Sequence, residues 1–254
     1  MSITNTESKR KFLKAVIISN EKIAGHTYHL KVQSEDIKNI DYTPGMHMKV
    51  VVESNDDSLQ NVKLRSYSIW DFDSEKGTID IAVCTHSSGL GSKWIEQAEA
   101  GNDFYFFLKK TLIVDDSADN YFFIGDISTL GHFYKVNRAL PKDIKVFSFM
   151  YGNETDFFSD IDGTKPFDFY PLPSDKHLPA PIEFLEEKIT GTLDKLHKDY
   201  SIKPEASSGS CIAYIGGDAR VCAELTSFFT RKLGWHPSQI KMKSFWNPDK
   251  VREE

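Results

Sequence analysis

Cysteine is scarce in this sequence, and the spacing of the few cysteines excludes several kinds of site. The 254 residues contain only Cys84, Cys211 and Cys222, and no two of them form a CxxC pair. A disulfide framework, a structural zinc site and an iron–sulfur cluster all need closer spacing. The eight histidines form no ligand pattern, and His26 and His29, three apart in strand-like sequence, should face opposite sides. We therefore expect reduced cysteines and no resident metal.

Long apolar runs and an excess of basic charge are also missing. No window approaches the roughly 18 continuous apolar residues of a membrane span. Residues 1–20 contain no apolar run of signal-peptide length. These absences predict a cytoplasmic protein that does not enter a membrane. The net charge of −6, from 31 basic and 37 acidic residues, argues against nucleic acid as a bulk partner, because phosphate neutralisation needs a basic surface.

The composition is that of a globular protein, with 40% hydrophobic and 13% aromatic residues. A chain of 254 residues exceeds the usual size of one domain, so we expect two. In the first half, short segments rich in β-branched and aromatic residues alternate with turn signals, which is typical of a barrel or sandwich. One helix, with Leu90, Trp94, Ile95 and Ala98 on one face, interrupts them. The predicted strands are Phe12–Ser19, Thr27–Gln33, His47–Glu53, Leu64–Trp70, Thr78–Val83 and Asp103–Leu108.

The pattern changes after the polar stretch 115–120, where we expect the boundary between a domain of residues 1–115 and one of residues 116–254. Apolar strands then alternate with helices, as a parallel sheet covered on both faces requires. Ser128 or Thr129 should cap one helix, and Asp218 should cap another that Gly234 ends. A longer helix is expected from about Pro181 to Tyr200, after an irregular segment from Phe157 to His177. The predicted strands are Tyr121–Ile124, Lys145–Met150, Cys211–Ile215 and Ile240–Phe245.

The sequence Arg65-Ser66-Tyr67-Ser68 lies on a predicted strand. Arg65 and Tyr67 should share a face, because side chains alternate along a strand. These groups suit a flavin dinucleotide, with Arg65 on the pyrophosphate, Tyr67 stacked on the isoalloxazine and Ser68 near the reactive ring nitrogen. Taken alone, an exposed strand with an extended arginine is the better interpretation.

A Gly-Ser loop from His86 to Trp94 leads from a strand into the helix of the first half. The amides and the positive dipole end of a helix start bind phosphate, and Gly89 and Gly91 would let the phosphate approach the backbone. The loop differs from the Rossmann GxGxxG motif, because the residue three beyond Gly91 is Trp94. Taken alone, an ordinary helix cap is equally consistent with it.

Together these motifs resemble the siderophore-interacting protein family of ferric-siderophore reductases, a branch of the ferredoxin reductase superfamily. The first half carries RSYSIWD, Ile79-Asp80, H-x-x-G-x-x-S-x-W from His86 to Trp94, and Gly101-Asn102-Asp103. In the second half, Tyr121–Leu130 resembles the family's strand with Gly-Asp-Glu-Thr-Ala-Leu-Pro, and Ile212–Arg220 resembles its late strand and Gly-Glu turn. Phe245-Trp246 stands where a Tyr-Trp pair is expected. The resemblance implies a six-stranded antiparallel FAD-binding barrel followed by a parallel-sheet nicotinamide-binding domain.

The resemblance also implies roles for individual residues. FAD would be bound by Arg65, Ser66, Tyr67, Ser68, Ile81 and Val83, with His86, Gly89, Gly91 and Ser92 around its phosphates. The nicotinamide cleft and the adenine side of FAD would be bordered by Gly125, Asp126, Ser128 and Thr129, and the nicotinamide nucleotide would also meet Gly216, Gly217, Asp218 and Arg220. An anionic ferric siderophore would dock on basic residues near the flavin, chosen from Lys49, Lys241, Lys243, Lys250 and Arg252, beside Trp246.

The expected activity is transfer of electrons from NADH or NADPH through FAD to iron(III) held by a siderophore, by a monomer. Ile127, Gly131, Ala223 and Thr226 depart from the family pattern, so the preference between NADH and NADPH stays open. Two alternatives also stay open: a reductase coupled to a ferredoxin, and a flavin-binding or siderophore-binding protein without turnover.

Overall fold

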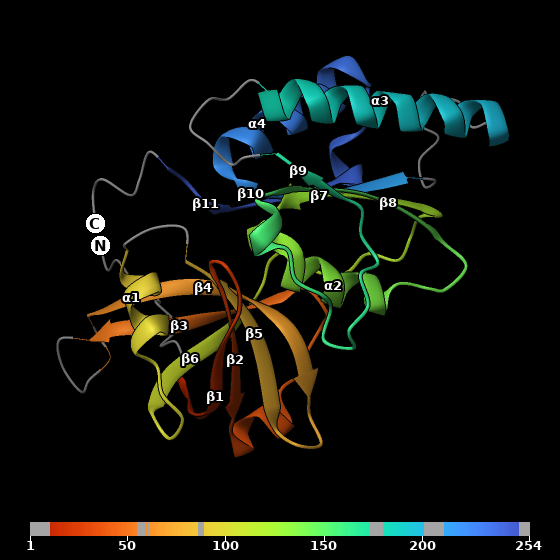
Figure 1. The fold of residues 1–254 in the computed structure, drawn as a ribbon. Helices are drawn as coiled ribbons and strands as arrows, with labels where there is room; N and C mark the ends of the chain where they lie inside the picture. Colours follow the sequence, from red (N-terminus) through yellow and green to blue (C-terminus); the bar gives the residue numbers. More distant parts are fainter. Residues whose placement is uncertain are drawn as a thin grey trace, which may run out of the picture.

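A computed structural model describes residues 11–54, 59, 61–85, 89–172, 180–200 and 211–248 of the protein. Figure 1 shows a barrel packed against a layered α/β domain, with helix α2 between the barrel and the sheet. Among the helices of the described ranges, none is long and apolar enough to cross a membrane.

The first half forms a closed barrel with the strand order β1-β2-β5-β4-β3-β6, and every strand pair is antiparallel. All six predicted strands are confirmed, most of them longer than expected. Side chains alternate between the two faces of β3, and Met46, Met48 and Val50 on one face pack in the barrel core. Helix α1 (Leu90–Gln97) stands between β5 and β6, and a short 3-10 helix, η1 (Glu35–Asn39), follows β2. The strands are β1 (Leu13–Ala24), β2 (Thr27–Gln33), β3 (Met46–Ser54), β4 (Val62–Asp73), β5 (Thr78–Cys84) and β6 (Asp103–Lys110).

The second half forms a parallel sheet with the order β11-β10-β7-β8-β9. The four predicted strands are confirmed, and β7 and β10 are buried along their whole length, as a sheet covered on both faces requires. The prediction missed β9, which has three residues and ends on Pro171 inside the segment expected to be irregular. The strands are β7 (Asn120–Asp126), β8 (Lys145–Gly152), β9 (Phe169–Pro171), β10 (Cys211–Asp218) and β11 (Ile240–Trp246).

Helix α2 (Leu130–Ala139) covers the sheet face next to the barrel, and α3 (Ala180–Tyr200) and α4 (Ala219–Ser227) cover the other face (Figure 1). The long predicted helix is confirmed as α3. After α4 a π-helical turn, η4 (Phe228–Lys232), continues to Gly234, whose φ of +70° ends the helical run as expected. Three short 3-10 helices complete the fold, η2 (Ile127–Thr129), η3 (Glu154–Asp156) and η5 (Pro237–Gln239).

The expected cap of α2 is wrong, whereas that of α4 is confirmed. Thr129 precedes α2 but makes no side-chain cap bond, and its hydroxyl donates to the carbonyl of Asp126 instead. The capping acceptor is Asp126, whose carboxylate accepts from the amide of Ser128 at the start of η2. Because the Asp126 carboxylate accepts from this amide, the hydroxyls of Ser128 and Thr129 do not cap the helix. At α4 the carboxylate of Asp218 accepts from the amide of Arg220, as predicted.

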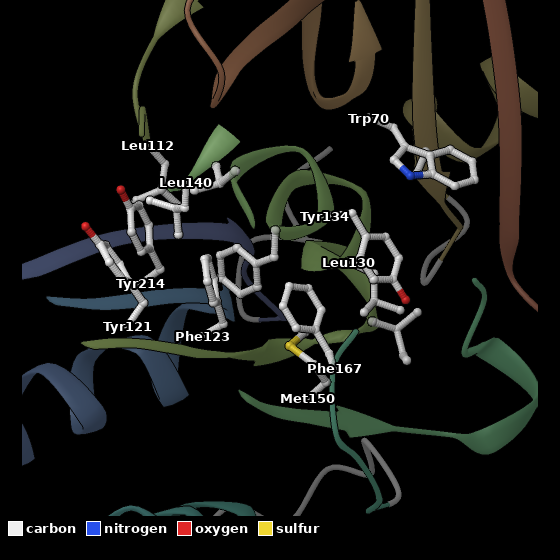
Figure 2. Packing of buried hydrophobic residues seen from close by; sticks show 14 of the residues in the cluster. Trp70, Leu112, Tyr121, Phe123, Leu130, Tyr134, Leu140, Met150, Phe167 and Tyr214 are labelled. Atoms are coloured by element: carbon white, nitrogen blue, oxygen red, sulfur yellow. The ribbon is translucent and has the colours of Figure 1, made fainter. Parts of the chain in front are cut away.

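The barrel and the sheet share one hydrophobic cluster (Figure 2). Trp70, Ala82 and Leu112 pack in the same cluster as Leu130 of α2 and Phe123 of β7. Gly131 makes this approach possible, because a Cβ at this position would lie 2.7 Å from the Cβ of Ala82. Glycine therefore stands where the family pattern has proline, at the point where α2 meets the barrel.

Polar contacts cross the same interface. The indole of Trp70 in β4 donates to Asp160 at 2.8 Å, and Arg138 of α2, which also binds Asp160, donates to the carbonyl of Trp70 at 2.6 Å. Lys135 of α2 forms an ion pair of 2.6 Å with Asp71 of β4. These bonds hold the barrel, α2 and the segment after β8 together.

Candidate functional site

Strand β4 presents two different faces, as its alternation predicted. Arg65 and Tyr67 both lie against Gly91 of α1: a Cβ there would be 2.8 Å from the Tyr67 hydroxyl oxygen and 3.3 Å from Cγ of Arg65. The Tyr67 hydroxyl donates to the carbonyl of Gly91 at 3.3 Å, and its ring stacks on Trp94 with centroids 5.6 Å apart. Burial raises the pKa of Tyr67, so its hydroxyl keeps its proton. The two predicted flavin-binding side chains are thus neighbours at the start of α1.

The start of α1 has the properties of a phosphate site. Gly89 is its N-cap residue and offers no side chain, and among the described residues no side chain caps the first amides of the helix. Ser92 is buried in the first turn. Glycine at position 91 lets Cγ and Cδ of Arg65 pass close to this turn, while the guanidinium donates to the carbonyl of Leu64 at 3.0 Å. A guanidinium within reach of a helix start suits a pyrophosphate.

Other residues expected around the flavin are placed less directly. Ile81 and Val83 are fully buried in the barrel core, so their side chains are not available to a ligand on the barrel surface. Ser68 is buried in β4 opposite His47 of β3. His86 lies outside the described residues, as do Lys250 and Arg252.

The strand order changes direction along the chain between β7 and β10, and crevices at such switch points bind ligands in α/β sheets. Gly125 and Gly216 are paired there at the carboxyl ends of the two strands. A Cβ on Gly125 or on Gly216 would collide with the side chain of Thr129, at 2.5 and 2.7 Å, so both glycines keep the strand ends closely packed. Gly217 has a φ of +108° and lies against the Asp126 carboxylate. The predicted glycines therefore do meet at one place.

Asp126 is the centre of a buried network at this switch point. One carboxylate oxygen accepts from the amide and hydroxyl of Ser128, at 2.9 and 2.5 Å. The other accepts from the amide of Asp218 and from the indole of Trp246, at 2.9 and 2.8 Å. Asp126 therefore ties the ends of β7, β10 and β11 together. Ser128 was expected at the nicotinamide cleft and Trp246 at the siderophore docking site, but both side chains donate their hydrogen bonds to Asp126.

Arg220 is folded back onto Asp218. Its Nε and one terminal nitrogen donate to the Asp218 carboxylate at 3.2 and 2.7 Å. The guanidinium is therefore already paired with an acid rather than extended toward a ribose phosphate.

Two of the predicted docking lysines meet at the junction between barrel and sheet. Lys243 of β11 reaches the hydroxyl of Ser66 in β4, with Nζ 3.4 Å from Oγ, and its Nζ lies 5.3 Å from the centre of the Phe245 ring. Lys49 pairs with Ser66 in the β3–β4 register and repels Lys243 electrostatically. Burial, Lys49 and Lys109 together lower the pKa of Lys243 to about 7. Lys241, the third candidate, instead forms a 2.7 Å ion pair with Asp115.

Sequence analysis missed three members of this junction, which are Lys109, His47 and His132. The two histidine rings are buried with centroids 4.6 Å apart, one from β3 and one from α2. His47 bonds Thr111 at 2.7 Å, and His132 donates from Nε2 to the carbonyl of Leu112. Burial lowers the pKa of both, that of His132 to about 3, so both rings are neutral. Spacing gave no signal, because the two histidines are 85 positions apart in the sequence.

Comparisons with known proteins agree with this geometry. Residues 14–106 match the family model described as an oxidoreductase FAD-binding domain, a stretch that spans the barrel strands but less than half of the chain. No curated protein sequence matches the chain.

Several solved structures share the fold over nearly the whole chain. A siderophore-interacting protein from Acinetobacter baumannii has a TM-score of 0.72 at 13% identity, covering 96% of both chains. The siderophore-interacting protein SipS from Aeromonas hydrophila has a TM-score of 0.70 at 13% identity, covering 93% of this chain and 98% of the other. The ferredoxin–NADP+ reductase from Plasmodium falciparum has a TM-score of 0.67 at 15% identity, covering 92% and 96%.

At these identities the likeness shows the fold, and the resemblance found in the sequence is confirmed at that level. The match of residues 14–106 to an oxidoreductase FAD-binding domain adds that the barrel binds FAD. Together, the matched domain and the fold identify the chain as a flavin-dependent oxidoreductase with the ferredoxin reductase-like fold.

Proposed function

We propose that the protein is a cytoplasmic FAD-dependent ferric-siderophore reductase that takes electrons from NADH or NADPH. Residues 1–115 form its FAD-binding domain and residues 116–254 its nicotinamide-binding domain in this proposal. A bound flavin would supply the conversion of a two-electron hydride donor into single-electron steps. Reduction releases the iron, because hard oxygen ligands hold iron(III) far better than iron(II).

The residues at β4 and α1 fit a flavin dinucleotide. The amides at the start of α1, which no side chain in the described ranges caps, and the guanidinium of Arg65 provide the positive field that a pyrophosphate needs. Gly91 lets the Tyr67 hydroxyl approach the helix start, because a Cβ there would lie 2.8 Å from the hydroxyl oxygen. Tyr67 and Trp94 are held in a stack that restricts the orientation of the Tyr67 ring. The chain thus binds and orients this cofactor with groups that need no acid or base function.

The contact between Lys243 and Ser66 is the observation that carries the choice of an anionic iron chelate. It joins the last strand of the second domain to the strand that bears Arg65 and Tyr67. Lys49 and Lys109 add positive charge at the same place, although the whole chain has a net charge of −6. An anionic chelate would therefore be attracted to the junction rather than to the rest of the surface. Siderophore-interacting proteins among the similar structures support the same substrate class.

The first test concerns the electron donor. The purified protein is mixed without oxygen with NADH, with NADPH or with a reduced ferredoxin, and the flavin absorbance is followed. We expect one of the two nicotinamides to bleach the flavin. Bleaching by ferredoxin alone would replace the nicotinamide in this proposal with a protein donor.

The second test concerns the acceptor. Ferric siderophores of the catecholate and hydroxycarboxylate classes are added to the reduced protein, and iron(II) is trapped by a ferrous-specific chelator. Reoxidation of the flavin together with the appearance of iron(II) supports the proposal. A reduced flavin that transfers no electrons to any ferric chelate would overturn it and leave a flavin-binding protein without this turnover.

A reductase coupled to a ferredoxin is the second candidate, and the switch point favours it. Asp126 and Ser128 direct their hydrogen bonds to each other and to Trp246, and Arg220 is paired with Asp218. These bonds would have to be exchanged for a nicotinamide nucleotide to use the same side chains. The donor test above separates the two candidates.

A further inference from the structure

A cavity lies between helix α1 and the barrel. Its volume is about 470 Å³, within the range of ~300 to 1,000 Å³ that is typical of small-molecule sites. One side is formed by α1, and the other by β1, the end of β3 and the start of β6 (Figure 1). Among the described residues, its lining comes from the first domain alone. The cavity is therefore distinct from the junction at which the sheet meets the barrel.

The inner wall of this cavity is apolar and partly aromatic. Ile17 and Phe104 belong to the buried core of the barrel, and Trp94 of α1 and Val52 of β3 pack against that core. The rings of Trp94 and Phe104 meet edge to face, with centroids 5.7 Å apart. Aromatic rings attract one another beyond the area that they bury, so this wall suits a flat aromatic group.

The charged groups at the rim leave one positive charge uncompensated. Two acids line the cavity, and both already have partners: Glu53 forms an ion pair of 3.0 Å with Lys63, and Asp103 forms one of 2.7 Å with Lys14. The remaining charged side chain of the lining is that of Lys93, which is exposed and pairs with no acid in the described part of the chain. The rim therefore favours a ligand with one negative charge.

The neutral polar groups of the rim offer mainly hydrogen-bond donors. The side-chain oxygen of Asn102 already accepts from the amide of Glu99 at 2.9 Å, so the NH₂ group of Asn102 is left for a ligand. The indole N–H of Trp94 and the side-chain amide of Gln97 bond to none of the other described residues. An ammonium group near several N–H donors matches the acceptor oxygens of a carboxylate.

We propose that this cavity binds an aromatic monocarboxylate, with its ring against Trp94, Phe104 and Val52 and its carboxylate beside Lys93. Trp94 also stacks on Tyr67, with centroids 5.6 Å apart, but Tyr67 and Arg65 do not line the cavity. The ligand would thus contact the residue that supports the Tyr67 ring without occupying the flavin surface. The inference goes beyond the proposed function and does not depend on the electron donor or acceptor.

The test is calorimetric titration of the oxidised FAD-loaded protein with 2-naphthoate at neutral pH. Two related molecules are titrated in parallel. The alcohol 2-naphthalenemethanol has the same rings without the charge, and octanoate has the charge without the rings. Naphthoate should bind about tenfold more tightly than either, because it alone satisfies both the apolar wall and Lys93.

Lys93→Met is the decisive variant, because methionine keeps an unbranched apolar chain and removes the charge. It should bind naphthoate about tenfold more weakly, and the advantage of naphthoate over the alcohol should disappear. Ala98→Phe would fill the cavity and should abolish binding of both naphthalene ligands while FAD stays bound. Lys195→Met, at an exposed lysine of helix α3, is the matched control and should bind naphthoate like the wild type. Thermal melts check that each variant is folded.

Labelling of tryptophan with nitrogen-15 locates the ligand by magnetic resonance. The chain has four tryptophans, and the indole N–H groups of Trp70 and Trp246 are bonded to Asp160 and Asp126. Naphthoate should shift the indole signal that is missing from Trp94→Phe. The signals of Trp70 and Trp246 should stay in place.

Binding of naphthoate that shifts the Trp94 signal and weakens in Lys93→Met supports the inference. Equal binding by the wild type and Lys93→Met overturns it, as does a shift confined to the other tryptophans. Octanoate that binds as tightly as naphthoate refutes the aromatic class. Release of FAD during the titration would show competition for the flavin surface and would also refute a separate site. A folded protein that binds none of the three molecules contradicts the inference.

Discussion

The half-buried amine of Lys243 makes the free energy of unfolding depend on pH. Its folded-state pKa of about 7 lies below its usual value of 10.5, so the unfolded chain holds more protons between these values. Stability therefore rises with pH across this window, and the penalty of burying the charge is fully present below about pH 7. Lys243→Met removes the penalty. The variant should melt above the wild type at pH 6, and the difference should shrink steadily as the pH rises toward 10.5.

Thermal melts of both flavin-free proteins at one-unit intervals from pH 6 to pH 10 measure this difference. Other titrating groups affect both proteins equally, which leaves the contribution of Lys243. A constant difference across the range would mean that the amine is solvated and has its ordinary pKa.

Tyr67 contributes both to the barrel and to the candidate flavin surface. Its ring packs against the barrel core and Trp94, while its hydroxyl makes one bond to Gly91. Tyr67→Phe loses this hydrogen bond, so its free energy of unfolding should fall by about 0.5 to 1.5 kcal/mol. The variant should still bind flavin. Tyr67→Ala also removes the ring, so it should destabilise the flavin-free protein by about 2 to 4 kcal/mol and lower its flavin content. Urea unfolding and the flavin-to-protein absorbance ratio measure the two effects. Full flavin content in Tyr67→Ala would exclude the ring from the site.

At the scale of elements, the start of α1 depends on a residue without a side chain. A Cβ at Gly91 would press on Tyr67 and Arg65, so Gly91→Ala should displace both and weaken FAD binding about tenfold or more. Gly191→Ala is the matched control. Gly191 lies on α3 with open space around it, and alanine there should stabilise the helix by about 0.5 to 1 kcal/mol without affecting FAD. Titration of the flavin-free variants with FAD compares them, and equal affinities would place the phosphate elsewhere.

Strands and helices were predictable where one local pattern dominates. Alternation identified β4 and placed Arg65 and Tyr67 on one face, and continuous apolar sequence identified β7 and β10. The three-residue β9 has too few side chains to show a period, and it exists because β8 offers it hydrogen bonds. The predicted cap of α2 was wrong because the Asp126 carboxylate competes with the hydroxyls of Ser128 and Thr129 for the same amides.

Contacts between distant segments were not predictable. The Lys243–Ser66 contact joins residues 177 positions apart, and no spacing rule records such a pairing. The family pattern led to Lys243 and Lys49 but not to Lys109 or the two buried histidines. The hydrogen bonds of Ser128 to Asp126 and of Arg220 to Asp218 likewise could not be predicted, because they depend on how the strand ends pack.

At the scale of the molecule, barrel and sheet should unfold together. The cluster around Trp70, Leu130 and Phe123 belongs to both, and Arg138 of α2 donates across it to the carbonyl of Trp70 at 2.6 Å. Unfolding one half would expose the apolar surface of the other, so one cooperative transition is expected. Far-ultraviolet circular dichroism and tryptophan fluorescence in urea should give the same midpoint. Separate midpoints for the two signals would show that the shared cluster is too weak to couple the halves.

The shared cluster also changes what the connection between the halves does. Leu112 and Asp115 are anchored to the second domain, but Asp116 and Ser117 are exposed. If packing alone holds barrel and sheet together, a cut between Asp116 and Ser117 should leave the two pieces associated, as two subunits of a dimer would be. The protein would then behave as an obligate heterodimer whose partners happen to be translated in one chain. The connecting peptide would serve to raise the local concentration of one half around the other rather than to set their geometry.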